Sequence, residues 1–129
     1  MPQQIIDAER LNRSLDGLGR IGHTHSGMQR VAFSPLDVEG RTHTISLMRR
    51  AGLEIKIDPA GNIIGRKEGS EPGLPAIGLG SHVDTVPNGG KYDGALGTLA
   101  AIECAQTLQD QGMLTRHPLE ILVFTNEEG

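Results

Sequence analysis

The chain has 129 residues, of which 36% are hydrophobic, so it is long enough for one domain with its own core and too short for two. Its formal net charge of -4, with two phenylalanines, one tyrosine and no tryptophan, excludes the basic surface and stacking platform of a nucleic-acid-binding protein. The N-terminus lacks the basic start and apolar stretch of a signal peptide, and no apolar run could span a bilayer, so we expect a cytoplasmic protein without membrane contact.

The first half of the chain predicts two helices followed by a β-hairpin. Apolar residues at helical spacing indicate the first helix, and Ser34 followed by Pro35 is typical of the start of another. A turn sequence at 58–61 separates two short β-like runs, which predicts the hairpin. The expected elements are a helix from Gln3 to about Leu18, a loop from Gly19 to Arg30, a helix from Ser34 to about Ala51, and strands Leu53 to Ile57 and Asn62 to Arg66.

The second half predicts a strand, a helix and a strand. Residues 76–83 form an apolar run that predicts a buried strand, residues 95–111 predict a helix, and residues 119–125 predict a second strand. A helix-length connection between two apolar strands predicts parallel neighbours, whose carboxyl ends share one edge of the sheet. The sequence therefore predicts an α/β fold with a parallel βαβ core and an added β-hairpin.

A histidine and an aspartate follow the first of these strands. His82 and Asp84 are two residues apart, so in an extended chain Asp84 can accept a hydrogen bond from one imidazole nitrogen of His82. The other nitrogen is then free to bind a metal ion. A solvated His-x-Asp tripeptide without any ligand is the alternative that this short pattern leaves open.

A third acid, Asp93, lies in the glycine-rich segment NGGKYDG at 88–94. A carboxylate held there can bridge two cations about 3.5–4 Å apart, which is the spacing of two-metal hydrolases. The alternative is a solvated turn in which Asp93 caps the helix that follows.

Two adjacent acids, Glu127 and Glu128, follow the last predicted strand. Adjacent carboxylates repel one another, so burying them in a cleft needs compensating positive charge, which metal ions supply. One carboxylate can then coordinate while its neighbour acts as general base. The alternative is that both acids are solvated at a fraying chain end.

These segments together resemble the amidase branch of the binuclear zinc metallopeptidases. That branch contains N-carbamoyl-L-amino-acid hydrolases, allantoate amidohydrolases and β-ureidopropionases. The resemblance rests on GSHVDTVPNGGKYDG at 80–94 and LVFTNEEG at 122–129, with support from RVAFSPLD at 30–37 and DPAGNIIGR at 58–66.

The resemblance implies a role for each residue of the pattern. His82 binds one metal ion, Asp93 bridges both and Glu128 binds the other. Glu127 is the general base and Asp84 orients His82. The implied cofactors are two divalent ions, zinc or manganese, and the implied reaction is hydrolysis of a carbamoyl or related C–N amide of a small-molecule substrate.

The resemblance also bears on the extent of the chain. Family members take further metal ligands from sequence beyond the glutamate pair, and a separate lid domain supplies substrate contacts and the dimer interface. We therefore expect residues 1–129 to be the N-terminal portion of a zinc-aminopeptidase-like catalytic domain, truncated and inactive as it stands.

Two alternatives of function remain open. An aminoacylase or dipeptidase of the wider group would share the same pattern of ligands. A non-catalytic fragment that self-associates would follow if the sheet leaves an apolar face and a strand edge exposed.

Other chemically active residues are weaker candidates. His23 and His25 form a pair in the predicted loop that could bind metal, although neither adjoins the acidic pattern. Cys104 lies in a helical pattern without a paired base or a second thiol, which predicts a buried structural thiol.

Overall fold

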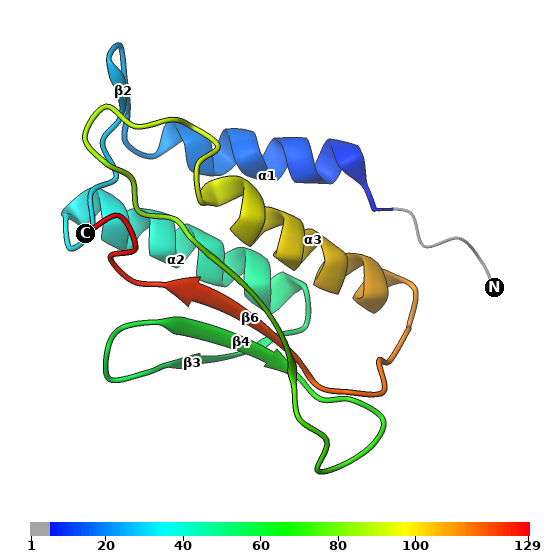
Figure 1. Ribbon diagram of the computed structural model, residues 1–129. Helices are drawn as coiled ribbons and strands as arrows, with labels where there is room; N and C mark the ends of the chain where they lie inside the picture. The colour runs from blue at the N-terminus through cyan, green and yellow to red at the C-terminus, as the bar shows by residue number, and fades with distance from the viewer. Residues whose placement is uncertain (1–5) are drawn as a thin grey trace.

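A computed structural model describes residues 6–129 of the protein (Figure 1). Three helices, a four-stranded sheet and a small two-stranded sheet make up this part of the chain. In chain order the elements are α1 (Ala8–Arg20), β1 (His23–Thr24), β2 (Gly27–Met28), α2 (Pro35–Arg50), β3 (Glu54–Ile57), β4 (Ile63–Lys67), β5 (Ile77–His82), α3 (Ala95–Asp110) and β6 (Leu119–Phe124).

The larger sheet has the strand order β3-β4-β6-β5 and is mixed. β5 and β6 are parallel, with Ile77 opposite Leu119 at one end and His82 opposite Phe124 at the other. β3 pairs with β4, and β4 with β6, in antiparallel fashion. The parallel βαβ core and the added hairpin are both confirmed.

The helices start where local capping chemistry allows. The Ser34 hydroxyl accepts a hydrogen bond from the Asp37 N–H at 3.2 Å, and Pro35 occupies the first turn of α2, as the sequence predicts. α1 starts later than predicted, because Asp7 caps it and its first residue is Ala8. Residues 3–5 of that prediction lie outside the described residues. None of the helices within residues 6–129 has the length and apolarity to cross a membrane.

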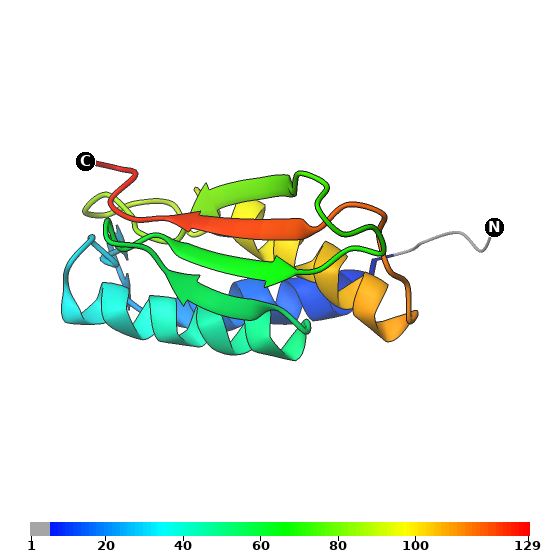
Figure 2. The ribbon, with the colours of Figure 1, turned by 90° about the horizontal axis from the view of Figure 1, so that it is seen from below.

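All three helices lie against one face of the four-stranded sheet (Figure 2). The core forms between this helical layer and the strand side chains that point toward it, because alternate residues of a strand share a face. No element of residues 6–129 covers the opposite face in this view. Core residues with at most 1% exposure include Leu18, Met48, Ile63, Leu99, Ile121 and Val123.

β5 is an exposed edge strand, so the prediction of a buried strand is wrong. Ile77 and Leu79 are 48% and 38% exposed. Within residues 6–129 β5 pairs with β6 alone, and an apolar run cannot by itself distinguish a central strand from an edge strand. Gly80 stands where a side chain would meet the Phe124 ring, which lets the two strands pack closely.

α3 buries different residues than its sequence suggests. Cys104 is exposed, so the prediction of a buried thiol is wrong, and the charged Glu103 beside it is buried. α3 carries apolar or small side chains on most of its surface, so its pattern did not indicate which side faces the core. Glu103 is accommodated because the Arg10 guanidinium donates to both of its oxygens at 2.7 Å, and the Thr107 hydroxyl and Asp7 N–H donate as well.

The Glu103 ion pair predicts an acid-sensitive contribution to stability. Burial raises the pKa of the Glu103 carboxyl, but the hydrogen bonds from Arg10, Asp7 and Thr107 outweigh it, so the net pKa is lowered. The contribution is therefore present above the ordinary pKa of 4.5 and is lost as the pH falls through the folded-state value. Glu103→Gln should reduce the free energy of unfolding at pH 7 by about 1–3 kcal/mol.

Urea unfolding between pH 3 and pH 7 checks this expectation. The difference between the wild type and Glu103→Gln should shrink on the acid side, and a difference independent of pH would contradict it. Glu9→Gln is the matched control, because the Glu9–Arg13 pair at 3.6 Å is solvent-exposed and should contribute at most about 1 kcal/mol.

Candidate metal and catalytic site

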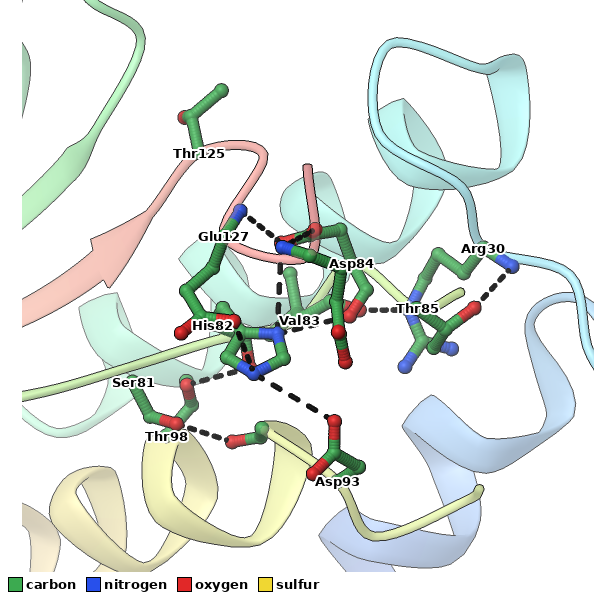
Figure 3. A network of polar contacts seen from close by, with 12 residues as sticks. Arg30, Ser81, His82, Val83, Asp84, Thr85, Asp93, Thr98, Thr125 and Glu127 are labelled. Carbon is green, nitrogen blue, oxygen red and sulfur yellow. Dashed lines mark hydrogen bonds and ion pairs between the residues drawn. The ribbon is translucent and has the colours of Figure 1, made fainter. Parts of the chain in front are cut away.

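The candidate site lies where β5 and β6 end side by side. Their parallel register places His82 opposite Phe124, so the residues after each strand emerge at the same edge of the sheet. Asp84 follows β5, and the Glu127–Glu128 pair follows β6 after a single turn through Asn126, which has a left-handed φ of 54°. Figure 3 shows His82, Asp84 and Glu127 close together at this edge.

The His82 ring has a defined tautomer. Its Nδ1 lies 3.0 Å from the backbone carbonyl oxygen of Asp84, and because a carbonyl only accepts, Nδ1 carries the proton. The sequence predicted this hydrogen bond to the Asp84 carboxylate, but Nδ1 lies 3.6 Å from that oxygen, so the partner is the carbonyl instead. The lone pair of Nε2 is left facing Glu127 Oε2 at 3.3 Å and Asp93 Oδ2 at 3.9 Å.

The Asp84 carboxylate connects the two strand ends. It is 2% exposed and accepts hydrogen bonds from the backbone N–H groups of Glu127 at 3.4 Å and Glu128 at 3.1 Å. A carboxylate satisfied by backbone donors can be buried at acceptable cost. Asp84 therefore fixes the backbone of the acidic pair relative to β5.

Asp93 is followed by a glycine that no residue with a Cβ can replace without a clash. Gly94 has a φ of 64°, and a Cβ on it would overlap the His82 ring. Its carbonyl accepts a hydrogen bond from the Ser81 hydroxyl at 2.9 Å, which ties the start of α3 to β5. α3 has no side-chain cap, so Asp93 does not cap it, and the Asp93 carboxylate is free to face His82.

His82, Asp93 and Glu128 form a cluster of potential metal ligands. Each offers one ligand atom, and these atoms all lie within 4.8 Å of one another. A hydrogen bond shared with Asp93, partial burial and repulsion from the Asp93 charge together raise the pKa of the Glu128 carboxyl. Imidazole nitrogen and carboxylate oxygen both suit divalent zinc, and a set of acceptors facing one another fits a cation between them.

Two of the weaker candidates lie outside this cluster. His23 and His25 are both exposed, His23 in β1 and His25 in the turn after it. Within residues 6–129, the only group of three possible ligands is the one formed by His82, Asp93 and Glu128.

Arg30, which was not predicted from the sequence, lies behind the site with no exposed surface. Its Nε donates to the Val83 carbonyl at 2.6 Å, and its Nη1 donates to the carbonyls of Leu18 at 3.0 Å and Ile21 at 2.7 Å. Burial lowers the pKa of the Arg30 guanidinium, and attraction to acidic neighbours partly offsets this. An arginine in a glycine-rich loop ordinarily indicates a solvated side chain, so no local signal predicted its burial.

The fold and the site together define a peptidase-like hydrolase domain. The sequence pattern of peptidase family M28 matches residues 62–129, more than half of the chain, and the chain belongs to that family. The matched region contains all five site residues predicted from the sequence.

Similar proteins confirm the resemblance to amidases. The chain is 44% identical over 126 residues to an N-carbamoyl-L-amino acid amidohydrolase of Geobacillus stearothermophilus, covering 97% of this chain and 31% of that protein. It is 41% identical over 124 residues to a ureidoglycolate hydrolase of Arabidopsis thaliana, covering 95% of this chain and 26% of that protein. The chain thus spans less than a third of the length of these relatives.

Solved structures agree with the fold. A hydantoinase/carbamoylase family amidase from Burkholderia ambifaria superposes with a TM-score of 0.93 at 42% identity, covering 96% of this chain and 31% of that one. An aminopeptidase PepT from Bacillus cereus, at 18% identity, has a TM-score of 0.72 over 96% of this chain and 38% of that one, which shows a shared fold alone.

The close approach of Gly94 to His82 predicts a large effect of one methyl group. Gly94→Ala should lower the free energy of unfolding by about 2–5 kcal/mol, because a left-handed φ costs an L-residue about 1–2 kcal/mol and overpacking against the ring costs about 1–3. Gly90→Ala is the control in the same loop, since a Cβ there meets no atom within 4 Å. Urea unfolding measures both variants, and equal stabilities would contradict the packing described.

Proposed function

We propose that the chain forms part of a divalent-cation-dependent amidohydrolase that cleaves linear C–N amide bonds, with N-carbamoyl amino acids or related ureido acids as substrates. The observation that carries this proposal is the convergence of His82 Nε2 with the carboxylates of Asp93 and Glu128 at the ends of two parallel strands. The names of the relatives, which act on carbamoyl and ureido compounds, point to the same bond type.

The ligand cluster suits two divalent ions, zinc or manganese. His82 would hold one ion, Glu128 the other, and Asp93 would lie between them and bridge both. Cations bound there would polarise an amide carbonyl oxygen and lower the pKa of water. The described residues give each ion two ligands, one of them shared, and catalytic zinc usually has three protein ligands, so further ligands are expected from other residues.

Glu127 is the residue best placed to move protons. Its carboxylate is half-exposed and lies 3.3 Å from His82 Nε2, one of the potential ligand atoms. There it would accept a proton from the attacking water and return it to the leaving nitrogen. Asp84 holds the backbone of Glu127, so the carboxylate stays beside the cluster rather than rotating away with a loose chain end.

An aminoacylase or dipeptidase would use the same ligands, since the chemistry at the cleaved C–N bond is similar. The distinction depends on the groups that recognise the rest of the substrate. The relatives above favour the carbamoyl and ureido class, whereas the aminopeptidase shares only its fold with this chain.

A second candidate role, self-association, is favoured by the exposed edge of the sheet. In the part of the chain that the structure describes, one edge of β5 is unpaired, with Ile77 and Leu79 partly exposed, and Phe124 is 42% exposed. Unpaired edges with apolar side chains pair readily with other strands.

The proposed catalytic roles can be tested in a chimera. The chain replaces the matching 126 residues of the Geobacillus stearothermophilus relative, so any activity depends on the residues tested. Glu127→Gln keeps the shape of the side chain but removes the base, and turnover of an N-carbamoyl amino acid should fall by about 10²–10⁴-fold with unchanged zinc content. Asp93→Ala should instead remove bound zinc.

Kinetic assays and elemental analysis of the purified chimera give the result. Loss of zinc in Glu127→Gln but not in Glu128→Gln would exchange the two roles. Cleavage of dipeptides without any cleavage of carbamoyl compounds would favour the aminoacylase or dipeptidase alternative.

Self-association of the 129-residue chain predicts a concentration-dependent sedimentation coefficient. Ile77→Lys places a charge on the strand edge and should shift the chain toward the monomer. Leu114→Lys is the control, because Leu114 is similarly exposed but lies in the loop before β6. Sedimentation velocity over a wide concentration range decides the matter, and a monomer at all concentrations would exclude this role.

A further inference from the structure

Arg30 has an unusual environment for an arginine. Its side chain has no exposed surface, and all three of its side-chain hydrogen bonds are donated to backbone carbonyls rather than to carboxylates. Gly40 of α2 provides the space, since a Cβ there would overlap the Arg30 side chain. A residue this costly to bury is expected to have a specific structural task.

The contacts of Arg30 surround the peptide segment that follows β5. Its Nε holds the carbonyl of Val83, which lies between His82 and Asp84 (Figure 3). Its backbone N–H donates to the Thr85 hydroxyl at 3.0 Å, and its carbonyl accepts from the Thr85 N–H at 2.9 Å. The same guanidinium binds the end of α1 through the carbonyls of Leu18 and Ile21.

This segment determines two features of the site. The Asp84 carbonyl sets the tautomer of His82, and the Asp84 carboxylate holds the amides of Glu127 and Glu128. Both depend on the orientation of the peptide groups from Val83 to Thr85. Arg30 holds this segment at its start through the Val83 carbonyl and at its end through two hydrogen bonds with Thr85. No other side chain of the described residues donates a hydrogen bond to the Val83 carbonyl in the structure.

We propose that Arg30 is a positioning residue for the metal site: its buried guanidinium fixes the segment 83–85 and thereby the relative placement of His82, Asp84 and the glutamate pair. This inference rests on the proposed function, because it assigns Arg30 a role in cation binding. Arg30 touches neither a ligand atom nor a reacting group, and it acts only through the backbone.

Arg30 can affect cation binding in two ways, through its charge and through its hydrogen bonds. A buried positive charge beside the site repels a bound cation, so removing the charge alone should tighten cation binding. Loss of positioning should weaken cation binding, because the ligands are no longer held in place. The two effects therefore have opposite signs.

Zinc titration calorimetry of the 129-residue chain at pH 7 tests the proposal. Arg30→Met keeps the length of the side chain without its charge or donors and should bind zinc at least tenfold more weakly. Arg30→Lys keeps the charge but lacks the planar donor fork that reaches three carbonyls, and should also bind more weakly. Glu103→Gln is the control, since it is destabilising but Glu103 bonds to Asp7, Arg10 and Thr107 rather than to any site residue, so its zinc affinity should be unchanged.

A second measurement needs no cation. Amide hydrogen exchange followed by NMR should be faster at Thr85, Glu127 and Glu128 in the Arg30 variants than in Glu103→Gln at matched global stability. Zinc binding that is unchanged or tighter in Arg30→Met, or equal exchange at these amides, would overturn the role of Arg30. If the 129-residue wild type bound no zinc, the zinc content of the chimera would decide the metal site, and hydrogen exchange would decide the role of Arg30. If Arg30→Met did not fold, the Lys variant would supply both measurements.

Discussion

The parallel pairing of β5 with β6 is the constraint on which the rest of the site depends. His82, the last residue of β5, stands opposite Phe124, the last residue of β6. The residues that follow β6 therefore emerge beside His82. A parallel pair needs a crossover, and α3 supplies it with Asp93 immediately before its first turn. A slip of one residue in this register would turn His82 to the other face and separate it from the acids.

The site brings several carboxylates close together, and the surrounding protein donates hydrogen bonds to only some of them. The Asp84 carboxylate receives two backbone N–H groups and is therefore stable in its buried position. Among the described residues no backbone N–H donates to the carboxylates of Asp93 and Glu128, and their proximity raises the pKa of the Glu128 carboxyl. The carboxylate that holds the backbone in place therefore has hydrogen-bond donors, whereas the charges of the two acids proposed to bind cations are not neutralised by backbone donors of the described residues.

Much of this arrangement could be predicted from the sequence, because it depends on local patterns. The cap at Ser34, the hairpin turn and the strand–helix–strand order are local signals, and together they placed five residues at one sheet edge. The edge position of β5 and the exposure of Cys104 could not be predicted, since each depends on which neighbours the fold supplies. Arg30 was missed for the same reason: its partners are backbone carbonyls of Leu18, Ile21 and Val83, which no side-chain pattern reveals.

The region around α2 supports both strand ends at once. Before α2, Arg30 holds the Val83 carbonyl after β5. Within α2, Arg41 donates to the Thr125 hydroxyl at 2.9 Å, directly after β6, and also to the carbonyl of Gly61.

The β3–β4 hairpin completes this support from the other side. The Thr125 hydroxyl donates to the Gly61 carbonyl at 2.6 Å, and the Thr125 N–H donates to the Asn62 side chain at 2.9 Å. Asn62 is in turn held by hydrogen bonds to Asp58, so the hairpin turn is itself rigid. Because Thr125 lies two residues before Glu127, the turn between β3 and β4 determines where the acidic pair begins, and the hairpin is part of the framework of the site although it contributes no ligand.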